Sequence, residues 1–202
     1  MTDMTTAKMM GIMGSLLVFI GVLINFFLRF DDTNTFSFII MIIFFITGIL
    51  IVLISMKFIS DETKNDTIFT SYFLYSILWI VALCMPFIIL ASINENPSVT
   101  STIYLIVLIT VGIIARCILI VAACFLTRSF KHLAKYEKNT MFNTIGPLYI
   151  AGTSLILPLF IIAEILNVQT LPVIGGIFLL IAAVIQIVAF SIMPEKLKKP
   201  IT

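Results

Sequence analysis

The stretch SFKHLAKYEKNTMF, Ser129–Phe142, is a short polar segment between two long apolar runs, and SMKFISDETKNDTIF, Ser55–Phe69, is its earlier counterpart. Aligned with each other, both segments give Ser-x-Lys-x-(Ile/Leu)-small, later Lys-Asn, and then Thr, an apolar residue and Phe. The earlier copy holds Asp66 as one extra residue. Two related polar turns, each between apolar runs, indicate a duplicated hairpin that crosses a membrane twice. The pattern therefore predicts an architecture and no specific activity.

The composition of the chain excludes a soluble domain. Its 202 residues are 61% hydrophobic and only 11% charged, with a mean hydropathy of +1.21. A spanning helix needs roughly 20 apolar residues, and the chain offers six such runs. The runs are continuous, whereas a transmembrane barrel has segments of about ten residues in alternation. The predicted fold class is an all-α integral membrane protein with six transmembrane helices, forming one polytopic domain over residues 1–202.

Positively charged residues predict how the six spans are oriented. The spans are expected at about 9–28, 36–56, 68–93, 101–126, 144–166 and 171–193. With six spans, both termini and both polar segments lie on one side, which carries ten Lys and Arg residues, while Arg29 alone lies on the other. Lys and Arg flanking a span prefer the cytoplasm. We therefore expect a multi-pass protein of the cell membrane with both termini cytoplasmic.

The resemblance between the two segments continues into the apolar runs that follow them. Pro86 comes 17 residues after Phe69 and Pro158 comes 16 after Phe142, and they open PFIILASI and PLFIIAEI. This register predicts a parallel repeat with units of about 36–93 and 101–166. Each proline removes a backbone hydrogen bond and is a candidate helix kink. Transporters build sites at equivalent broken helices, but proline is also common in ordinary membrane helices, so both interpretations stay open.

Arg116 is the only charge near the middle of any predicted span. A charge at that depth costs roughly 2.5–3.5 kcal/mol on insertion scales, so it is expected to face protein or water. Thr153 and Ser154 at a similar depth, and the amide of Gln186, are candidate partners. Glu164 is the ionic partner by charge, but it lies on the order of 15 Å away along the axis. Arg116 is either an anion or carboxylate contact or a structural hydrogen-bond hub.

Signatures of catalysis and cofactor binding are missing from the sequence. His132 is the only histidine, and Cys84, Cys117 and Cys124 lack the paired spacing of a metal or redox site. The chain has no Walker loop, no dinucleotide fingerprint and no HExxH motif. We expect no catalytic, cofactor-binding or metal site, no nucleic-acid partner and no enzymatic activity.

The basic residues of the two polar segments have two interpretations. Each Lys or Arg resting on anionic lipid headgroups would contribute about 1 kcal/mol. Alternatively, the charges satisfy the orientation rule alone, and Thr67 and Thr140 are the N-cap candidates of the following helices. The second interpretation is favoured because the orientation rule already accounts for the charges.

Three segments of the chain resemble a known family. They are GILIVLISMKFISDETKNDTIF, SFKHLAKYEKNTMFNTIGPLYIAGTSL and the closing FSIMPE. Together they resemble the archaeal multi-pass membrane family called domain of unknown function 996, and the resemblance covers nearly the whole chain. It implies an archaeal source and a polytopic helical fold, and it supplies no activity and no functional residues.

Two functions of different classes remain open. The first is favoured by the small size, the short loops and the absence of convergent polar groups inside the spans. It is a non-catalytic accessory or scaffold subunit of a membrane assembly, with the bilayer, other membrane subunits or a homo-oligomer as partners. The alternative is a small carrier or channel for a metabolite or ion, with a site around Arg116. A polar cavity containing Arg116 beside Pro86 and Pro158 would favour transport, whereas a dry bundle would favour the accessory subunit.

Overall fold

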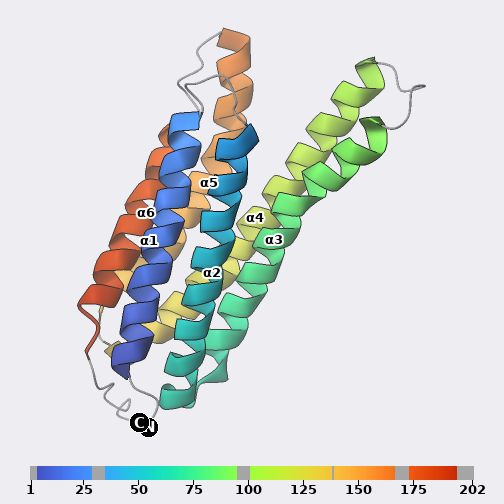
Figure 1. Cartoon of the computed structure of the whole chain (residues 1–202). Helices are drawn as coiled ribbons and strands as arrows, with labels where there is room; N and C mark the ends of the chain where they lie inside the picture. Colours follow the sequence, from blue (N-terminus) through green and yellow to red (C-terminus); the bar gives the residue numbers. More distant parts are fainter. Residues whose placement is uncertain (1–3, 29–34, 95–100, 138, 167–172, 195–202) are drawn as a thin grey trace.

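The computed structural model is all-helical and describes residues 4–28, 35–94, 101–137, 139–166 and 173–194 (Figure 1). Six helices follow one another in these residues, which confirms the predicted all-α class. They are α1 (Met4–Leu28), α2 (Thr35–Thr63), α3 (Asp66–Asn94), α4 (Ser101–Glu137), α5 (Met141–Leu166) and α6 (Val173–Ser191).

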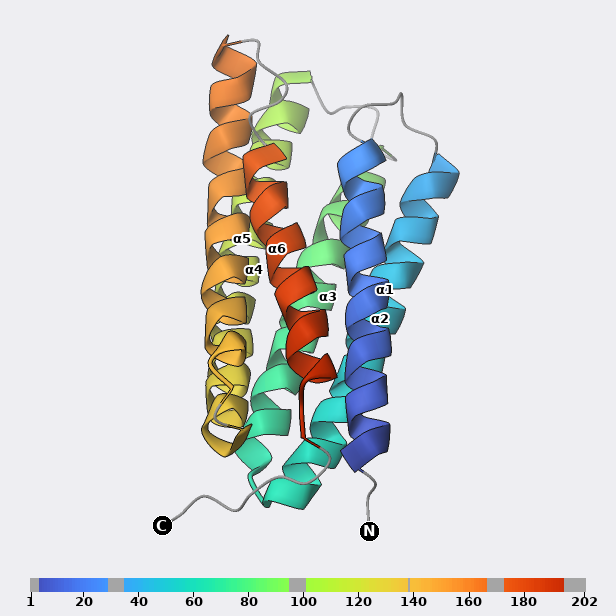
Figure 2. The ribbon, with the colours of Figure 1, turned by 90° about the vertical axis from the view of Figure 1, so that its left-hand side faces the viewer.

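The helices form a closed ring in chain order. Each helix packs against the next one in sequence, and α6 returns to pack against α1. Figure 2 shows α6 in front, between α5 and α1. The α3–α4 hairpin is tilted, so that it diverges from α1 and α2 at the end of the bundle where α3 finishes (Figure 1). The start of α1 and the end of α6 lie at the same end of the bundle as the α2–α3 and α4–α5 turns.

Five helices of the described residues are long and apolar enough to cross a membrane. The segments are Met4–Ile24, Ile39–Thr63, Asp66–Met85, Ile109–Tyr136 and Ile174–Ser191. Helix α5 lies where the fifth span was predicted, and part of its length has side chains outside the described set. Large apolar side chains such as Ile43, Ile109 and Ile177 are exposed on the outside of the ring. This outer surface fits a lipid environment.

The polar segments are largely helical, so the prediction that they are connecting turns is wrong for most of their length. Helix α2 continues to Thr63 and α4 to Glu137, well beyond the predicted ends near 56 and 126. The extension of α4 buries Phe130 and Leu133 on one face while charged residues lie on the other. This amphipathic pattern lets the helix continue after the apolar run has ended.

Two asparagine side chains make the capping hydrogen bonds at the turns, although the predicted Thr140 does hold the position directly before α5. The side-chain oxygen of Asn65 accepts a hydrogen bond from the backbone N–H of Thr67 at 3.1 Å. Asn139 accepts one from the N–H of Met141 at 3.0 Å. In the first turn Lys64 adopts a φ of 54°, which reverses the chain before the cap. Asn is a preferred N-cap because its short side chain reaches the free N–H groups of the first turn.

Aromatic rings fill the core at the end of the bundle that carries these turns. Phe130, Phe142 and Phe190 come from α4, α5 and α6, and all three are fully buried. Their ring centroids lie 5.5 Å apart for Phe130–Phe142 and 5.4 Å apart for Phe142–Phe190. Tyr72 of α3 meets Phe130 edge-on at 6.3 Å. These contacts join four helices at one level.

Helices α1 and α2 approach closely at a pair of glycines. A Cβ atom placed on Gly48 would lie 2.7 Å from the backbone oxygen of Gly14, and a Cβ on Gly14 would lie 2.7 Å from the oxygen of Gly48. Small residues allow such backbone contact between membrane helices.

We predict that Gly48→Val destabilises the protein because its side chain has to force the two backbones apart. The expected loss is about 1–3 kcal/mol, the usual range for overpacking. Thermal unfolding in detergent would show it as a lower Tm. Gly112→Ala is the matched control, since a Cβ at Gly112 meets nothing within 4 Å. Equal Tm shifts in the two variants would contradict the close-contact argument.

Candidate functional site

A cavity of about 350 Å³ lies inside the ring and is lined by residues from all six helices. Its volume falls within the range of about 300–1,000 Å³ that is typical of small-molecule sites. Most of the lining side chains are apolar, contributed by every helix of the ring. The six helices therefore border a partly open space of ligand size.

Arg116 of α4 is the only charged residue among the described residues that line this cavity. It is half-buried, and it has an interaction with the rest of the described chain. A guanidinium carries five N–H donors, so it can hold one contact within the protein and still present a bidentate pair to an oxyanion. The apolar surroundings strengthen its electrostatic interaction with an anion, because screening there is weak.

Two hydroxyl-bearing residues of α5 accompany Arg116 in the lining. They are Thr153 and Tyr149, both buried. The Thr153 hydroxyl donates to the backbone oxygen of Tyr149 at 2.7 Å, one turn earlier. Its oxygen retains the capacity to accept a hydrogen bond.

Small residues on α4 and an aromatic pair from α2 and α3 shape the lining. A Cβ atom built on Gly112, one turn from Arg116, meets nothing within 4 Å, and Ala115 is also in the lining. Phe45 of α2 lies 4.8 Å from Trp79 of α3 between ring centroids, at an interplanar angle of 30°. The two rings contribute a large apolar surface to the lining.

The residues predicted from the sequence as partners of Arg116 are only partly brought together. Thr153 shares the cavity lining with Arg116, whereas Ser154 and Gln186 are not among the lining residues. Gln186 is buried, and its side-chain N–H donates to the Ser15 hydroxyl at 3.0 Å, which joins α6 to α1. The side chain of Glu164 lies outside the described set.

The two candidate kink positions lie within continuous helices. Helix α3 continues through Pro86 and α5 continues through Pro158, so neither proline ends its helix. Pro158 is exposed and is not part of the lining, and the side chain of Pro86 lies outside the described set. The predicted bends stay predictions.

Some lining residues that the sequence interpretation missed occupy matching positions of the two copies. Before the extra residue Asp66 the copies are 74 positions apart, as in Ser55–Ser129, and the lining pairs Met41–Ala115 and Phe45–Leu119 have this spacing. After Asp66 the spacing falls to 73, as in Phe69–Phe142, and the lining pair Leu83–Ile156 has it. Extending the alignment from the polar segments back into the preceding apolar runs would have paired Met41 and Phe45 with residues of α4.

Metal-binding chemistry has no support in the described part of the chain. No group of three or more His, Cys, Asp or Glu side chains within it could hold a metal ion. Cys84, Cys117 and Cys124 are free thiols on exposed positions of α3 and α4. That the whole chain binds no metal stays a prediction.

Comparisons with known proteins identify relatives of this chain. Residues 44–184 match the family described as "Protein of unknown function (DUF996)". An uncharacterized protein of Methanocaldococcus jannaschii is 25% identical over 161 residues, which cover 76% of this chain and 81% of that protein. No solved structure matches the chain. The matched range of the family contains most of the cavity lining, from Phe45 to Leu179.

Proposed function

This chain belongs to the DUF996 family, and we propose that it is a non-catalytic carrier of the cell membrane that binds a small organic anion inside its ring of helices. Its long apolar helices fit a membrane protein, and it has an archaeal relative. One observation carries the proposed function: the cavity has a mostly apolar lining in which Arg116 is the single charge among the described residues. An archaeal source is part of the proposal.

The chemistry of the cavity favours an anion with an apolar body. A carboxylate can accept two parallel hydrogen bonds from a guanidinium, a strong and directional pairing. A bound anion would also offset the roughly 2.5–3.5 kcal/mol that a charge at membrane depth costs. The remaining lining, including the Phe45–Trp79 pair, offers apolar surface to a short hydrocarbon chain or ring.

The proposal includes six spans and a parallel repeat, with α2–α3 and α4–α5 as the two copies. Several local features recur at the spacing of 74 residues. Ser55 donates to the Ala7 carbonyl oxygen at 2.6 Å, and Ser129 donates to that of Ile68 at 2.7 Å, each reaching a neighbouring helix. Three lining pairs in register with this repeat, Met41–Ala115, Phe45–Leu119 and Leu83–Ile156, support a cavity shared by the two copies. Transporters commonly have their substrate site at such an interface.

An accessory or scaffold subunit is the second candidate. The observation in its favour is that buried hydroxyls of the described residues serve packing, because they bond to backbone carbonyls. Within one helix, Ser15 donates to Gly11, Ser76 to Tyr72 and Thr153 to Tyr149; between helices, Ser55 donates to Ala7 and Ser129 to Ile68. Other membrane subunits or a second copy of the chain would then be the partners.

The proposed orientation has both termini in the cytoplasm. It is supported by the ten Lys and Arg residues on the predicted inner side against Arg29 alone on the other. Some of these residues, including Arg29 and Lys138, lie outside the described part of the chain. The start of α1 and the end of α6 share one end of the bundle (Figures 1 and 2), which is the arrangement an even number of spans requires.

We predict that octanoate binds the purified protein and raises its Tm, and that Arg116→Leu weakens binding by roughly 10- to 100-fold. The factor corresponds to the loss of charge-assisted hydrogen bonds of about 1.5–3 kcal/mol. Gly112→Leu should also weaken binding by filling the space next to Arg116. Isothermal titration of the detergent-solubilised protein measures both effects, with Ile113→Leu on the exposed face of α4 as the control. Octanoate binding unchanged by both cavity substitutions would rule out this site.

The accessory-subunit candidate predicts that a defined second protein co-migrates with the chain. Native purification in mild detergent, followed by mass spectrometry of the eluted complex, should then give one additional chain in fixed ratio. A lone monomer in every detergent tried would count against it and leave the carrier.

The orientation predicts the behaviour of reporters fused after Thr202 of the full chain. Green fluorescent protein should fluoresce there and alkaline phosphatase should be inactive, because these are the responses of the two reporters to a cytoplasmic location. The same pair of reporters before Met1 gives the matching test for the N-terminus. An active phosphatase at either end would overturn the orientation.

A further inference from the structure

Four basic side chains form a continuous stripe along the last turns of α4. This α4 basic stripe consists of Arg128, Lys131, His132 and Lys135, spaced so that they lie on one face of the helix. The four residues line a surface hollow of about 340 Å³ together with Cys124 and Thr127. Lys131 and Lys135 also line a second hollow that reaches Asn143 at the start of α5. Arg128, Lys131 and Lys135 are exposed, and His132 is half-buried.

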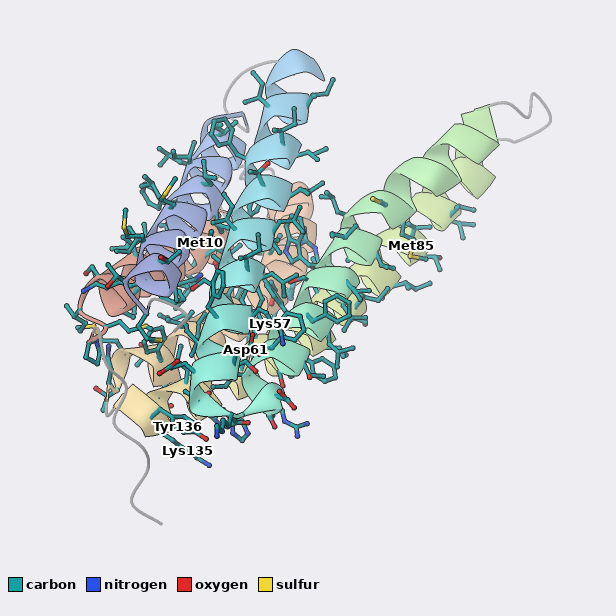
Figure 3. The ribbon with its side chains drawn as sticks, turned by 60° about the horizontal axis from the view of Figure 1, so that its bottom comes forward. Met10, Lys57, Asp61, Met85, Lys135 and Tyr136 are labelled. Atoms are coloured by element: carbon teal, nitrogen blue, oxygen red, sulfur yellow. The ribbon has the colours of Figure 1, made fainter. Side chains whose placement is uncertain are left out.

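The corresponding part of the first polar segment has a different charge. Its matching lysine, Lys57, forms an ion pair with Asp61 at 2.7 Å and lies 5.3 Å from the ring centre of Phe69. Figure 3 shows Lys57 and Asp61 together on α2, with Lys135 at the end of α4. Residues 55–69 contain two lysines and three carboxylates, whereas residues 128–142 contain four Lys and Arg and one Glu. No acidic residue is among the described residues that line either hollow.

Membrane orientation does not account for this difference. The orientation rule depends on Lys and Arg near the ends of the spans, and Asp and Glu contribute little to it. The first segment therefore satisfies the rule while its charge is neutralised locally. The α4 segment carries more unpaired positive charge than the first segment, which follows the same rule.

The position of the stripe on α4 indicates the kind of anion. The helix has 37 residues and is about 55 Å long, whereas the hydrocarbon core is about 30 Å thick. Val121 and Cys124 are exposed on the face that continues into Arg128 and Lys131. One face of α4 thus changes from apolar to basic within two turns, like the boundary between acyl chains and headgroups in a lipid leaflet.

We propose that the α4 basic stripe binds the phosphate of an anionic phospholipid. Arg128 lies nearest the apolar part of the face, and its planar guanidinium can hold two phosphate oxygens at once. Lys131 and Lys135 add point charges along the helix. The hydrocarbon chains of the lipid lie along Val121 and Cys124. This contact is separate from the central cavity and does not depend on the proposed carrier function.

The test uses the full chain in detergent, with phosphatidylglycerol and phosphatidylcholine as probes, and native mass spectrometry as the readout. The wild-type protein should retain phosphatidylglycerol and release phosphatidylcholine. The triple variant R128Q/K131Q/K135Q should lower the affinity for phosphatidylglycerol on the order of 100-fold, since each cation contributes about a factor of five. The control K57Q/D61N removes an opposite pair from α2, keeps the net charge and should bind like the wild type.

Two additional measurements distinguish a bound phospholipid from a bound phosphate group alone. The single variants K131Q and K135Q should each lose about five-fold in affinity, which keeps the test decisive if the triple variant unfolds. Glycerol phosphate should compete only weakly, because it lacks the acyl chains that lie along Val121 and Cys124. Equal retention of both lipids, an unchanged preference in the variants, or glycerol phosphate binding as tightly as the lipid would each overturn the proposal.

Discussion

Contact between three phenylalanine rings holds the end of the bundle where both polar turns lie. Phe130, Phe142 and Phe190 are fully buried and join α4, α5 and α6, while Tyr72 connects α3 to the same cluster. Lipid tails are as apolar as these side chains, so helices in a bilayer gain from close packing and not from leaving water. This packing fixes how the helices are placed at that end of the bundle. The cavity lies at a deeper level of the ring, which the aromatic cluster does not fill.

Glycine has opposite effects at two levels of the ring. Gly48 allows the backbones of α1 and α2 to touch, so that any added side chain meets Gly14. Gly112 faces open space beside Arg116, where its missing side chain becomes volume. The local sequences do not distinguish these cases, because both glycines stand among isoleucines and other apolar residues. The difference depends on which helix stands opposite, and at what distance.

The two polar segments show how far a shared pattern predicts structure. Both form a helix end and a turn capped by asparagine, as their related sequences suggest. The turns are shorter than predicted because Phe130 and Leu133 continue the buried face of α4 past the apolar run. The charges of the segments also differ, since Lys57 is neutralised by Asp61 whereas the α4 basic stripe has no acidic neighbour among the described residues of its hollow. The two related sequences therefore adopt similar backbone structures, but their surfaces carry different charge.

The sequence by itself determined that the chain is helical, that its helices number six in the described part, and that Arg116 is the charge to examine. These properties follow from the hydropathy and charge of consecutive residues, which are local quantities. Only the tertiary structure decided that the Gln186 side chain of α6 donates to the Ser15 hydroxyl of α1, and that Phe45, Trp79 and Arg116 line one cavity. Such contacts depend on the depth at which distant helices meet. Side-chain packing across the whole ring sets that depth, so it cannot be read from any single segment of the chain.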